Sequence, residues 1–181
     1  QVITAALAKE GYPVIMACLD PEKAASLCNR IQQETGNTQI EVRRIDLASL
    51  SSVNNFTGQL LKEGRPVSRL MNNAGILTTP VRKTEDGLET IVSVNYVAPY
   101  MLTRQLLPLM QPGCRIVNTV SCTYAIGRIE PDFFEKGRNG RFFRIPVYSN
   151  TKLALLLFTQ EFAERLQYKD ITINASDPGI V

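Results

Sequence analysis

The chain has 181 residues, of which 44% are hydrophobic and 20% are charged, and its formal net charge is +3. This size and composition are typical of one globular domain with a sizeable core. The chain contains no histidine, which excludes Ser-His-Asp triads, Cys-His pairs and histidine-ligated metal sites, so no metal site is predicted. Proton transfer near neutral pH must therefore use a carboxylate, a cysteine, or a tyrosine or lysine with a shifted pKa.

Segments with helical periodicity alternate with short apolar runs. In chain order, the pattern predicts a helix over 1–10, a strand over 14–18, a helix over 21–35, a strand over 40–45, a helix over 51–60, a strand over 68–71, a helix over 84–110, a strand over 115–120, a helix over 147–167 and a strand over 172–175. Asp20 is predicted to cap the second helix, and Pro99 must kink or divide the fourth because proline lacks the N–H. The near-continuous apolar strands are typical of a parallel sheet covered on both faces.

This alternation predicts a single α/β domain over residues 1–181, with a doubly wound parallel sheet and helices on both faces. Neither G-x-G-x-x-G nor G-x-x-x-x-G-K-[ST] occurs in the chain. A doubly wound fold needs a strand and a glycine-rich turn before its first helix. We therefore expect either an unusual start or a sequence that is cut.

The cysteines and the hydropathy favour a location inside the cell. The cysteines, which include no C-x-x-C pair, are Cys18, Cys28, Cys114 and Cys122. They are typical of reduced thiols in or near a core. The longest apolar run, residues 153–158, is too short to cross a bilayer, and no signal segment opens the chain. We expect a soluble, cytoplasmic protein without a membrane segment.

Tyr148 and Lys152 lie four residues apart on the last predicted helix, so their side chains share one face. The stripe around Lys152 contains Tyr148, Leu155, Leu156, Thr159 and Ala163, and the opposite side carries Asn150, Glu161 and Glu164. A lysine in an apolar stripe is directed toward the interior or a cleft, where its charge would lower the pKa of Tyr148. The alternative is a chance pair whose lysine extends from a half-buried face into water.

Polar or small residues follow several predicted strands. They are Asp46 after the second strand, Asn72-Asn73-Ala74-Gly75 after the third, Ser121 after the fourth and Asp177-Pro178-Gly179 after the last. Small residues at the carboxyl end of a strand let a ligand approach the backbone. Each feature alone could be a turn or a helix cap.

This ordered set closely resembles the short-chain dehydrogenase/reductase family over essentially the whole chain. The family's N-N-A-G is matched by residues 72–75, its helix asparagine by Asn95, its serine by Ser121, its Y-x-x-x-K by Tyr148 and Lys152, and its P-G by Pro178 and Gly179. Residues 17–20 and 148–158 are similar to the branch of retinol dehydrogenases and WW-domain oxidoreductases. The resemblance implies an NAD(P)-binding Rossmann-type domain whose glycine-rich turn lies before Gln1, and whose substrate loop and final strand lie after Val181.

The resemblance also implies a function. The protein would be an NAD(P)-dependent oxidoreductase that transfers a hydride between nicotinamide and an apolar carbonyl or alcohol. Tyr148 would be the general acid in reduction and the base in oxidation, and Lys152 would lower its pKa and hold the ribose. Ser121 would bond the substrate oxygen, and Asn95 would support a water. The alternative is a catalytically idle relative that binds nucleotide as a scaffold or redox sensor.

The cofactor contacts follow by the same resemblance. They are Asp46 and Leu47 at the adenine, Asn72, Asn73, Ala74 and Gly75 on the adenosine side, and Pro178, Gly179 and Val181 at the nicotinamide amide. Leu19 replaces the arginine that would pair with a 2′-phosphate, so the choice between NAD and NADP stays open. Asp177 stands where the branch has histidine.

Two further segments concern partners. Residues 133–144 interleave Phe133, Phe134, Phe142 and Phe143 with basic residues. We expect these phenylalanines to cover an apolar substrate mouth, and we expect no nucleic-acid partner although such a pattern can bind single strands. The last helix is apolar nearly all round over 153–158, which favours burial against another subunit. The resemblance likewise implies a homodimer or homotetramer.

Overall fold

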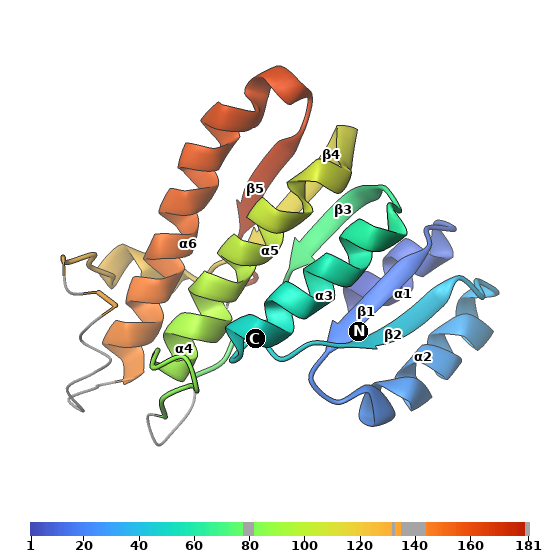
Figure 1. Ribbon diagram of the computed structural model, residues 1–181, viewed down its shortest axis with the longest axis horizontal. Helices are drawn as coiled ribbons and strands as arrows, with labels where there is room; N and C mark the ends of the chain where they lie inside the picture. Colours follow the sequence, from blue (N-terminus) through green and yellow to red (C-terminus); the bar gives the residue numbers. More distant parts are fainter. Residues whose placement is uncertain (78–81, 132, 135–143, 180–181) are drawn as a thin grey trace. The chain divides into compact units, whose positions relative to one another are not determined.

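The computed structural model describes residues 1–77, 82–131, 133–134 and 144–179. The chain divides into two compact units, Gln1–Asp46 and Leu47–Val181. Each unit contains a parallel sheet with helices packed on it (Figure 1), as the α/β prediction requires. The prediction that the two units form one domain stays a prediction. Among the described helices, none is both long and apolar enough to cross a bilayer.

The first unit contains α1 (Val2–Lys9), β1 (Val14–Cys18), α2 (Pro21–Thr35) and β2 (Ile40–Arg44). Strands β1 and β2 are parallel, and Val14 pairs with Ile40. The Asp20 carboxylate accepts a hydrogen bond from the Lys23 N–H at 3.1 Å and caps α2, as predicted. Gly36 ends this helix at φ 71°, a left-handed conformation that glycine adopts without a Cβ penalty.

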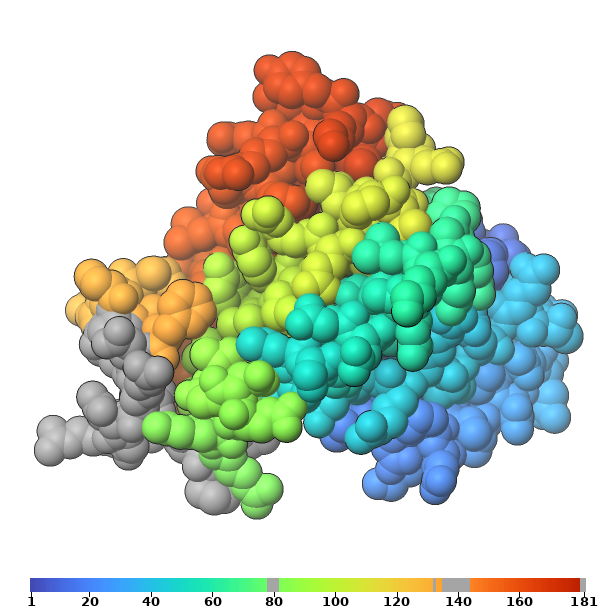
Figure 2. Space-filling view, in the orientation of Figure 1, coloured from blue at the N-terminus to red at the C-terminus, as the bar shows by residue number. Residues whose placement is uncertain are grey.

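The second unit has more elements around a sheet of order β3-β4-β5. In chain order they are α3 (Leu50–Glu63), β3 (Val67–Asn72), α4 (Thr90–Val92), the π-helix η1 (Ser93–Val97), α5 (Ala98–Leu106), η2 (Leu107–Leu109), β4 (Met110–Thr119), η3 (Cys122–Ile126), α6 (Arg144–Leu166), η5 (Gln167–Lys169) and β5 (Thr172–Ser176). Both sheet pairs are parallel. Figure 1 shows α3, α5 and α6 lying side by side across one face of this sheet. The same row of helices forms much of the surface in Figure 2.

Side chains of β4 alternate between this helical layer and the other face of the sheet. Cys114, Ile116 and Asn118 are buried, whereas Arg115 is exposed and Val117 is half-buried. Alternation with period two is what one covered face imposes on a strand. The core of the second unit therefore lies between the sheet and the helices α5 and α6.

A buried polar network crosses that core. The Asn72 side-chain amide donates to Asn118 Oδ1 at 2.8 Å and to Thr103 Oγ1 at 3.1 Å. The Asn118 amide donates to Thr159 Oγ1 at 2.9 Å, and Thr159 donates to the Leu155 carbonyl. Satisfied buried networks are stronger and more specific than single bonds. This one joins β3, β4 and α5 to α6, the helix that carries Tyr148 and Lys152.

The helix predicted over 84–110 is wrong at its start, whereas its end agrees to within one residue, because α5 and η2 continue to Leu109. The Thr84 N–H donates to the Leu88 carbonyl at 2.8 Å, and the Leu88 N–H donates to the Thr84 hydroxyl at 3.2 Å. These bonds form a turn, and helix begins only at Thr90, capped by the Glu89 carboxylate. A π-helical turn over 93–97 precedes Pro99 and accommodates its missing N–H, which bears out the predicted division.

Strand β4 begins five residues earlier than predicted, at Met110 rather than at 115. The prediction missed the start of this strand because Pro112 and Gly113 are not typical strand residues. The register with β3 shifts between Val67 and Arg69, so this part of the ladder is irregular. Gly113 has φ 88° and donates to the Asp170 carbonyl at 2.7 Å, which ties the start of β4 to the turn before β5.

Three smaller predictions also need correction. Helix α3 begins at Leu50 and is capped by Ser49, because the Ser49 hydroxyl accepts from the Ser52 N–H. The last helix begins at Arg144 instead of 147. All four cysteines are free, but Cys122 is exposed, so the expectation of a near-core thiol is wrong for this residue.

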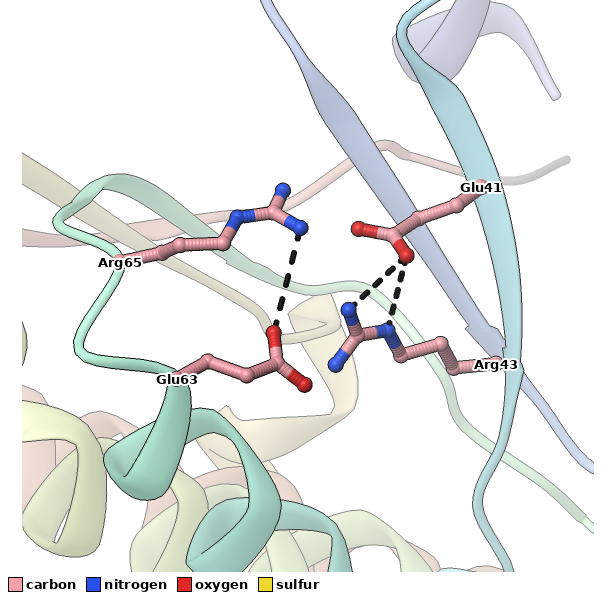
Figure 3. A network of polar contacts seen from close by, with 4 residues as sticks. All are labelled: Glu41, Arg43, Glu63 and Arg65. Atoms are coloured by element: carbon pink, nitrogen blue, oxygen red, sulfur yellow. Dashed lines mark hydrogen bonds and ion pairs between the residues drawn. The ribbon is translucent and has the colours of Figure 1, made fainter.

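Figure 3 shows one ion pair from each unit. In β2, two nitrogens of Arg43 bind the same Glu41 oxygen at 2.8 and 3.1 Å. After α3, an Arg65 nitrogen lies 3.9 Å from a Glu63 oxygen. The Glu63–Arg65 pair is long and partly exposed, so it adds little to stability because water screens it.

We expect Gly127→Ala to destabilise the protein. A Cβ at this position would lie 2.6 Å from the Ser149 carbonyl oxygen and 2.9 Å from the Leu153 Cβ. Such crowding should lower the free energy of unfolding by about 1–3 kcal/mol, measured by urea denaturation.

The matched control is Gly58→Ala in α3, where a Cβ would meet nothing within 4 Å. Alanine is the better helix former, so this variant should gain up to about 1 kcal/mol. Equal stability of the two variants would contradict the close packing of Gly127 against α6.

Candidate active site

The carboxyl ends of β3, β4 and β5 lie at one edge of the second sheet, where α/β proteins bind ligands. Asn73, Ala74 and Gly75 follow β3 and are exposed. The Thr119 hydroxyl at the end of β4 donates to Asn73 Oδ1 at 3.4 Å. At this edge, residues with small side chains therefore leave the backbone accessible beside polar side chains.

Lys152 of α6 faces this edge from inside the fold, as the helical stripe predicted. It is only 2% exposed, and its ammonium donates to the Thr119 carbonyl at 2.8 Å. Burial lowers the pKa of Lys152 because an ammonium loses hydration there. The ammonium lies 5.4 Å from the centroid of the Tyr148 ring, within the range of a cation–π interaction.

Asn95 and Gly75 complete the surroundings of this ammonium. Asn95 is fully buried in η1; its Oδ1 accepts from the Ile76 N–H at 2.8 Å, and its amide donates to the Ile76 carbonyl at 3.0 Å. A Cβ at Gly75 would lie 3.2 Å from Lys152 Nζ and 3.6 Å from Asn95 Oδ1. The glycine therefore leaves a cradle over the two side chains that any larger residue would fill.

Ser121 follows β4 and caps η3. Its hydroxyl accepts from the Thr123 N–H at 3.4 Å and from the Thr123 hydroxyl at 3.2 Å. The end of this segment is tied to α6, because the Arg128 N–H donates to Asn150 Oδ1 at 2.7 Å. The segment that carries Ser121 is thereby joined to the helix that carries Tyr148 and Lys152.

The remaining predicted cofactor residues lie in different places. After β5, the Gly179 N–H donates to Asp177 Oδ1 at 3.0 Å in a turn that includes Pro178, while Val181 lies outside the described residues. Leu47 belongs to the second unit, and its carbonyl accepts from the Ser93 hydroxyl at 2.9 Å. Leu19 and Asp46 belong to the first unit; Leu19 is exposed directly after β1.

Of the phenylalanines predicted to cover an apolar substrate mouth, Phe133 and Phe134 belong to the described residues. Phe133 is buried, and its ring contacts Tyr96 and Phe134 with centroids at 5.9 and 4.9 Å. Phe134 is half exposed. Phe142 and Phe143 lie outside the described residues.

Sequence reasoning missed two contributors to the site, Thr119 and Thr123, and also the buried cap Glu89 of α4. The Thr119 carbonyl leaves no side-chain signal, and Thr123 lies in the short helix η3 without belonging to any motif. Glu89 is buried and caps α4 with one oxygen, while its other oxygen has no hydrogen-bond partner among the described residues. Burial raises the pKa of Glu89. Its position before the apolar pair Ile91-Val92 could have indicated the cap.

Comparisons with known proteins identify the family of this chain. The family model described as short chain dehydrogenase matches residues 1–131. Retinol dehydrogenase 13 of Homo sapiens is 36% identical over 176 residues, which cover 96% of this chain and 53% of that protein. Retinol dehydrogenase 12 of Mus musculus is 37% identical over 177 residues, covering 97% of this chain and 55% of that protein. The chain thus spans about half the length of the curated relatives it matches.

Solved structures show the same fold. A crystal structure of an uncharacterised protein from Mycobacterium Paratuberculosis superposes with a TM-score of 0.84 and 34% identity, covering 98% of this chain and 63% of that one. A short-chain dehydrogenase from Sphingobium yanoikuyae, solved in complex with NADPH, has a TM-score of 0.77 at 21% identity and covers 99% and 65% of the two chains.

The buried ammonium predicts a pH dependence of stability. Because burial lowers the pKa of Lys152 in the fold, the unfolded chain binds more protons than the folded one between that lowered value and about 10.4. The free energy of unfolding should therefore rise with pH across this window. Lys152→Met removes the titrating group and with it this contribution.

The measurement is urea unfolding of both proteins from neutral pH to about pH 10. The stability of the wild type minus that of the variant should increase with pH, since other titrating groups cancel in the difference. A difference that is flat or decreases would contradict the burial of a charged Lys152.

Proposed function

This chain belongs to the short chain dehydrogenase family, and from this we infer that the whole protein is an oxidoreductase that uses NAD or NADP and acts on an apolar carbonyl or alcohol. The observation that carries the proposal is the buried ammonium of Lys152, between the Tyr148 ring and the cradle at Gly75. Among the described residues this ammonium has no ion pair with a carboxylate, and burial of such a cation costs several kcal/mol in desolvation. Lysines held at such a cost are frequent at functional sites.

The residues present fit a nicotinamide cofactor. We propose that Asn72, Asn73, Ala74 and Gly75 contact its adenosine side, because the last three are small or polar and exposed at the end of β3. Lys152 would donate to the ribose hydroxyls across the cradle. Pro178, Gly179 and Val181 would hold the nicotinamide amide, and Asp46 and Leu47 would flank the adenine. Leu19 would stand where an arginine would pair with a 2′-phosphate.

The choice between NAD and NADP stays open in this proposal. Leu19 offers no charge to a 2′-phosphate. Asp20 beside it is engaged as the cap of α2 and pairs with Lys23 at 2.9 Å. Titration of the whole protein with each cofactor would measure the preference directly.

When bound, the cofactor supplies or accepts the hydride. The chain's own residues would handle the proton. In reduction Tyr148 donates its hydroxyl proton to the substrate oxygen, and in oxidation it takes that proton back. The positive charge of Lys152 stabilises negative charge on the Tyr148 oxygen during the transfer. Ser121 donates a hydrogen bond to the substrate oxygen, and Asn95 supports a water near Lys152.

We propose an apolar, retinol-like alcohol or aldehyde as substrate. The similar proteins include retinol dehydrogenases 13 and 12, and the segment after Ser121 exposes apolar side chains. Those side chains are Tyr124, Ile126, Ile129 and Phe134. Exposed apolar groups gathered along one segment favour an apolar ligand.

Tyr148→Phe tests the proposal. It removes the transferable proton and leaves the ring beside Lys152, so turnover should fall by at least about 100-fold while cofactor affinity is kept. The assay follows the nicotinamide absorbance band with retinal or retinol, and fluorescence titration measures cofactor binding. The control Tyr168→Phe alters a tyrosine that is 90% exposed on η5 and should leave turnover unchanged.

Unchanged turnover in Tyr148→Phe would refute the assignment of this residue. A wild-type protein that binds NAD(P) tightly but converts no member of a broad panel of alcohols and aldehydes would support the alternative. In that case the protein would be a nucleotide-binding scaffold or redox sensor.

A cytoplasmic location stays a prediction from the free cysteines and is checked by cell fractionation.

We further propose a homodimer or homotetramer with α6 in the interface. Leu157 of α6 is 46% exposed, and the neighbouring Leu153 and Leu156 are half-buried. Leu157→Glu should weaken such an interface by burying a charge. Analytical ultracentrifugation should then show a shift toward monomer. A wild-type protein that is monomeric would refute this assembly.

A further inference from the structure

Thr123 binds the Ser121 hydroxyl twice. Its N–H lies 3.4 Å and its own hydroxyl 3.2 Å from Ser121 Oγ, and both are donors. A serine hydroxyl can accept two hydrogen bonds and donate one. With both lone pairs engaged by Thr123, the Ser121 hydroxyl has only its own proton left to offer.

We propose that Thr123 is a positioning residue that fixes the Ser121 hydroxyl as a hydrogen-bond donor toward a substrate carbonyl oxygen. The role rests on the proposed function, because it concerns the same site. A hydroxyl without such partners is free to rotate and can act as donor or acceptor. Thr123 removes that freedom before the substrate arrives, which is the kind of preorganisation that favours charge developing on the oxygen.

This arrangement divides the chemical work between two residues. In reduction the hydride forms a C–H bond, the carbonyl π electrons move to oxygen, and Tyr148 supplies the proton to that oxygen. The O–H bond of Ser121 stays intact and only donates a hydrogen bond. In oxidation Ser121 cannot accept the alcohol proton, since its lone pairs are occupied, so Tyr148 takes it.

The surroundings of Thr123 hold it in place. Thr123 lies in the first turn of η3 and is half-buried. Its β-branched side chain has restricted χ1 freedom. The other end of η3 is fixed to α6 through Arg128 and Asn150 and by the close contact of Gly127 with Ser149. The two donors to Ser121 therefore keep a defined position relative to Tyr148.

The experiment compares Thr123→Val, which keeps the shape and deletes the hydroxyl, with Thr123→Ser, which restores it. The probe is a long-chain fatty amide, whose carbonyl accepts a hydrogen bond but is not reduced, bound to the complex of the whole protein with NADPH or NADH. We expect Thr123→Val to weaken amide binding and to lower kcat for retinal, each by about 3- to 10-fold, the value of one hydrogen bond. Cofactor affinity should be unchanged, and Thr123→Ser should restore both quantities.

The outcomes are separable. If the wild type is active and Thr123→Val has the same amide affinity and the same kcat, the positioning role of Thr123 is refuted. The proposed function is then unaffected. Losses that Thr123→Ser fails to restore, together with a lowered unfolding midpoint in both variants, would show a merely structural role and also refute the positioning role. A wild type that neither binds cofactor nor reduces retinal would refute the proposed function and this inference with it.

Discussion

An ammonium group in the interior loses its hydration, and the groups around it have to compensate for that loss. In the second unit this holds for Lys152. Its charge is nearly removed from water, and among the described residues no ion pair with a carboxylate offsets the desolvation. The Thr119 carbonyl supplies a hydrogen bond at 2.8 Å, and the Tyr148 ring supplies a π face. Both partners depend on placement: one is the last residue of β4, and the other lies one turn earlier on α6.

That placement depends in turn on the register of the sheet and on how α6 packs against it. Asn72 pairs with Asn118 across β3 and β4, and their side chains are hydrogen-bonded inside the core. The bond from Asn118 to Thr159 joins the sheet to α6 two turns after Lys152. A shift by one residue would turn these amides out of the core and leave polar groups unpaired, so the network disfavours other registers. It thereby fixes how far Thr119 lies from Lys152.

The sequence predicted the elements well where the signal was local. The five strands and the cap at Asp20 follow from apolar runs and capping chemistry, and the inward turn of Lys152 follows from helical spacing. The turn at Thr84 was missed because its bonds join Thr84 to Leu88, and a threonine there is equally typical of a helix start. The start of β4 was missed because its pairing with β3 is irregular near Pro112. The hydrogen bond from Lys152 to the Thr119 carbonyl could not be predicted. Every residue has a backbone carbonyl, and these two residues are 33 positions apart.

In the proposed function the site depends on a buried cation, because Tyr148 rather than a histidine would carry the proton. A histidine can hold and release a proton near neutral pH without help, whereas a tyrosine needs positive charge close to its oxygen. An exposed lysine would supply little of that charge, since water screens it, but a buried one acts through a medium of lower dielectric constant. The same burial excludes bulky neighbours, which is why a Cβ at Gly75 would lie only 3.2 Å from the ammonium. This position borders the exposed end of β3, so a ligand of the proposed kind would approach the cation through the space that Gly75 leaves.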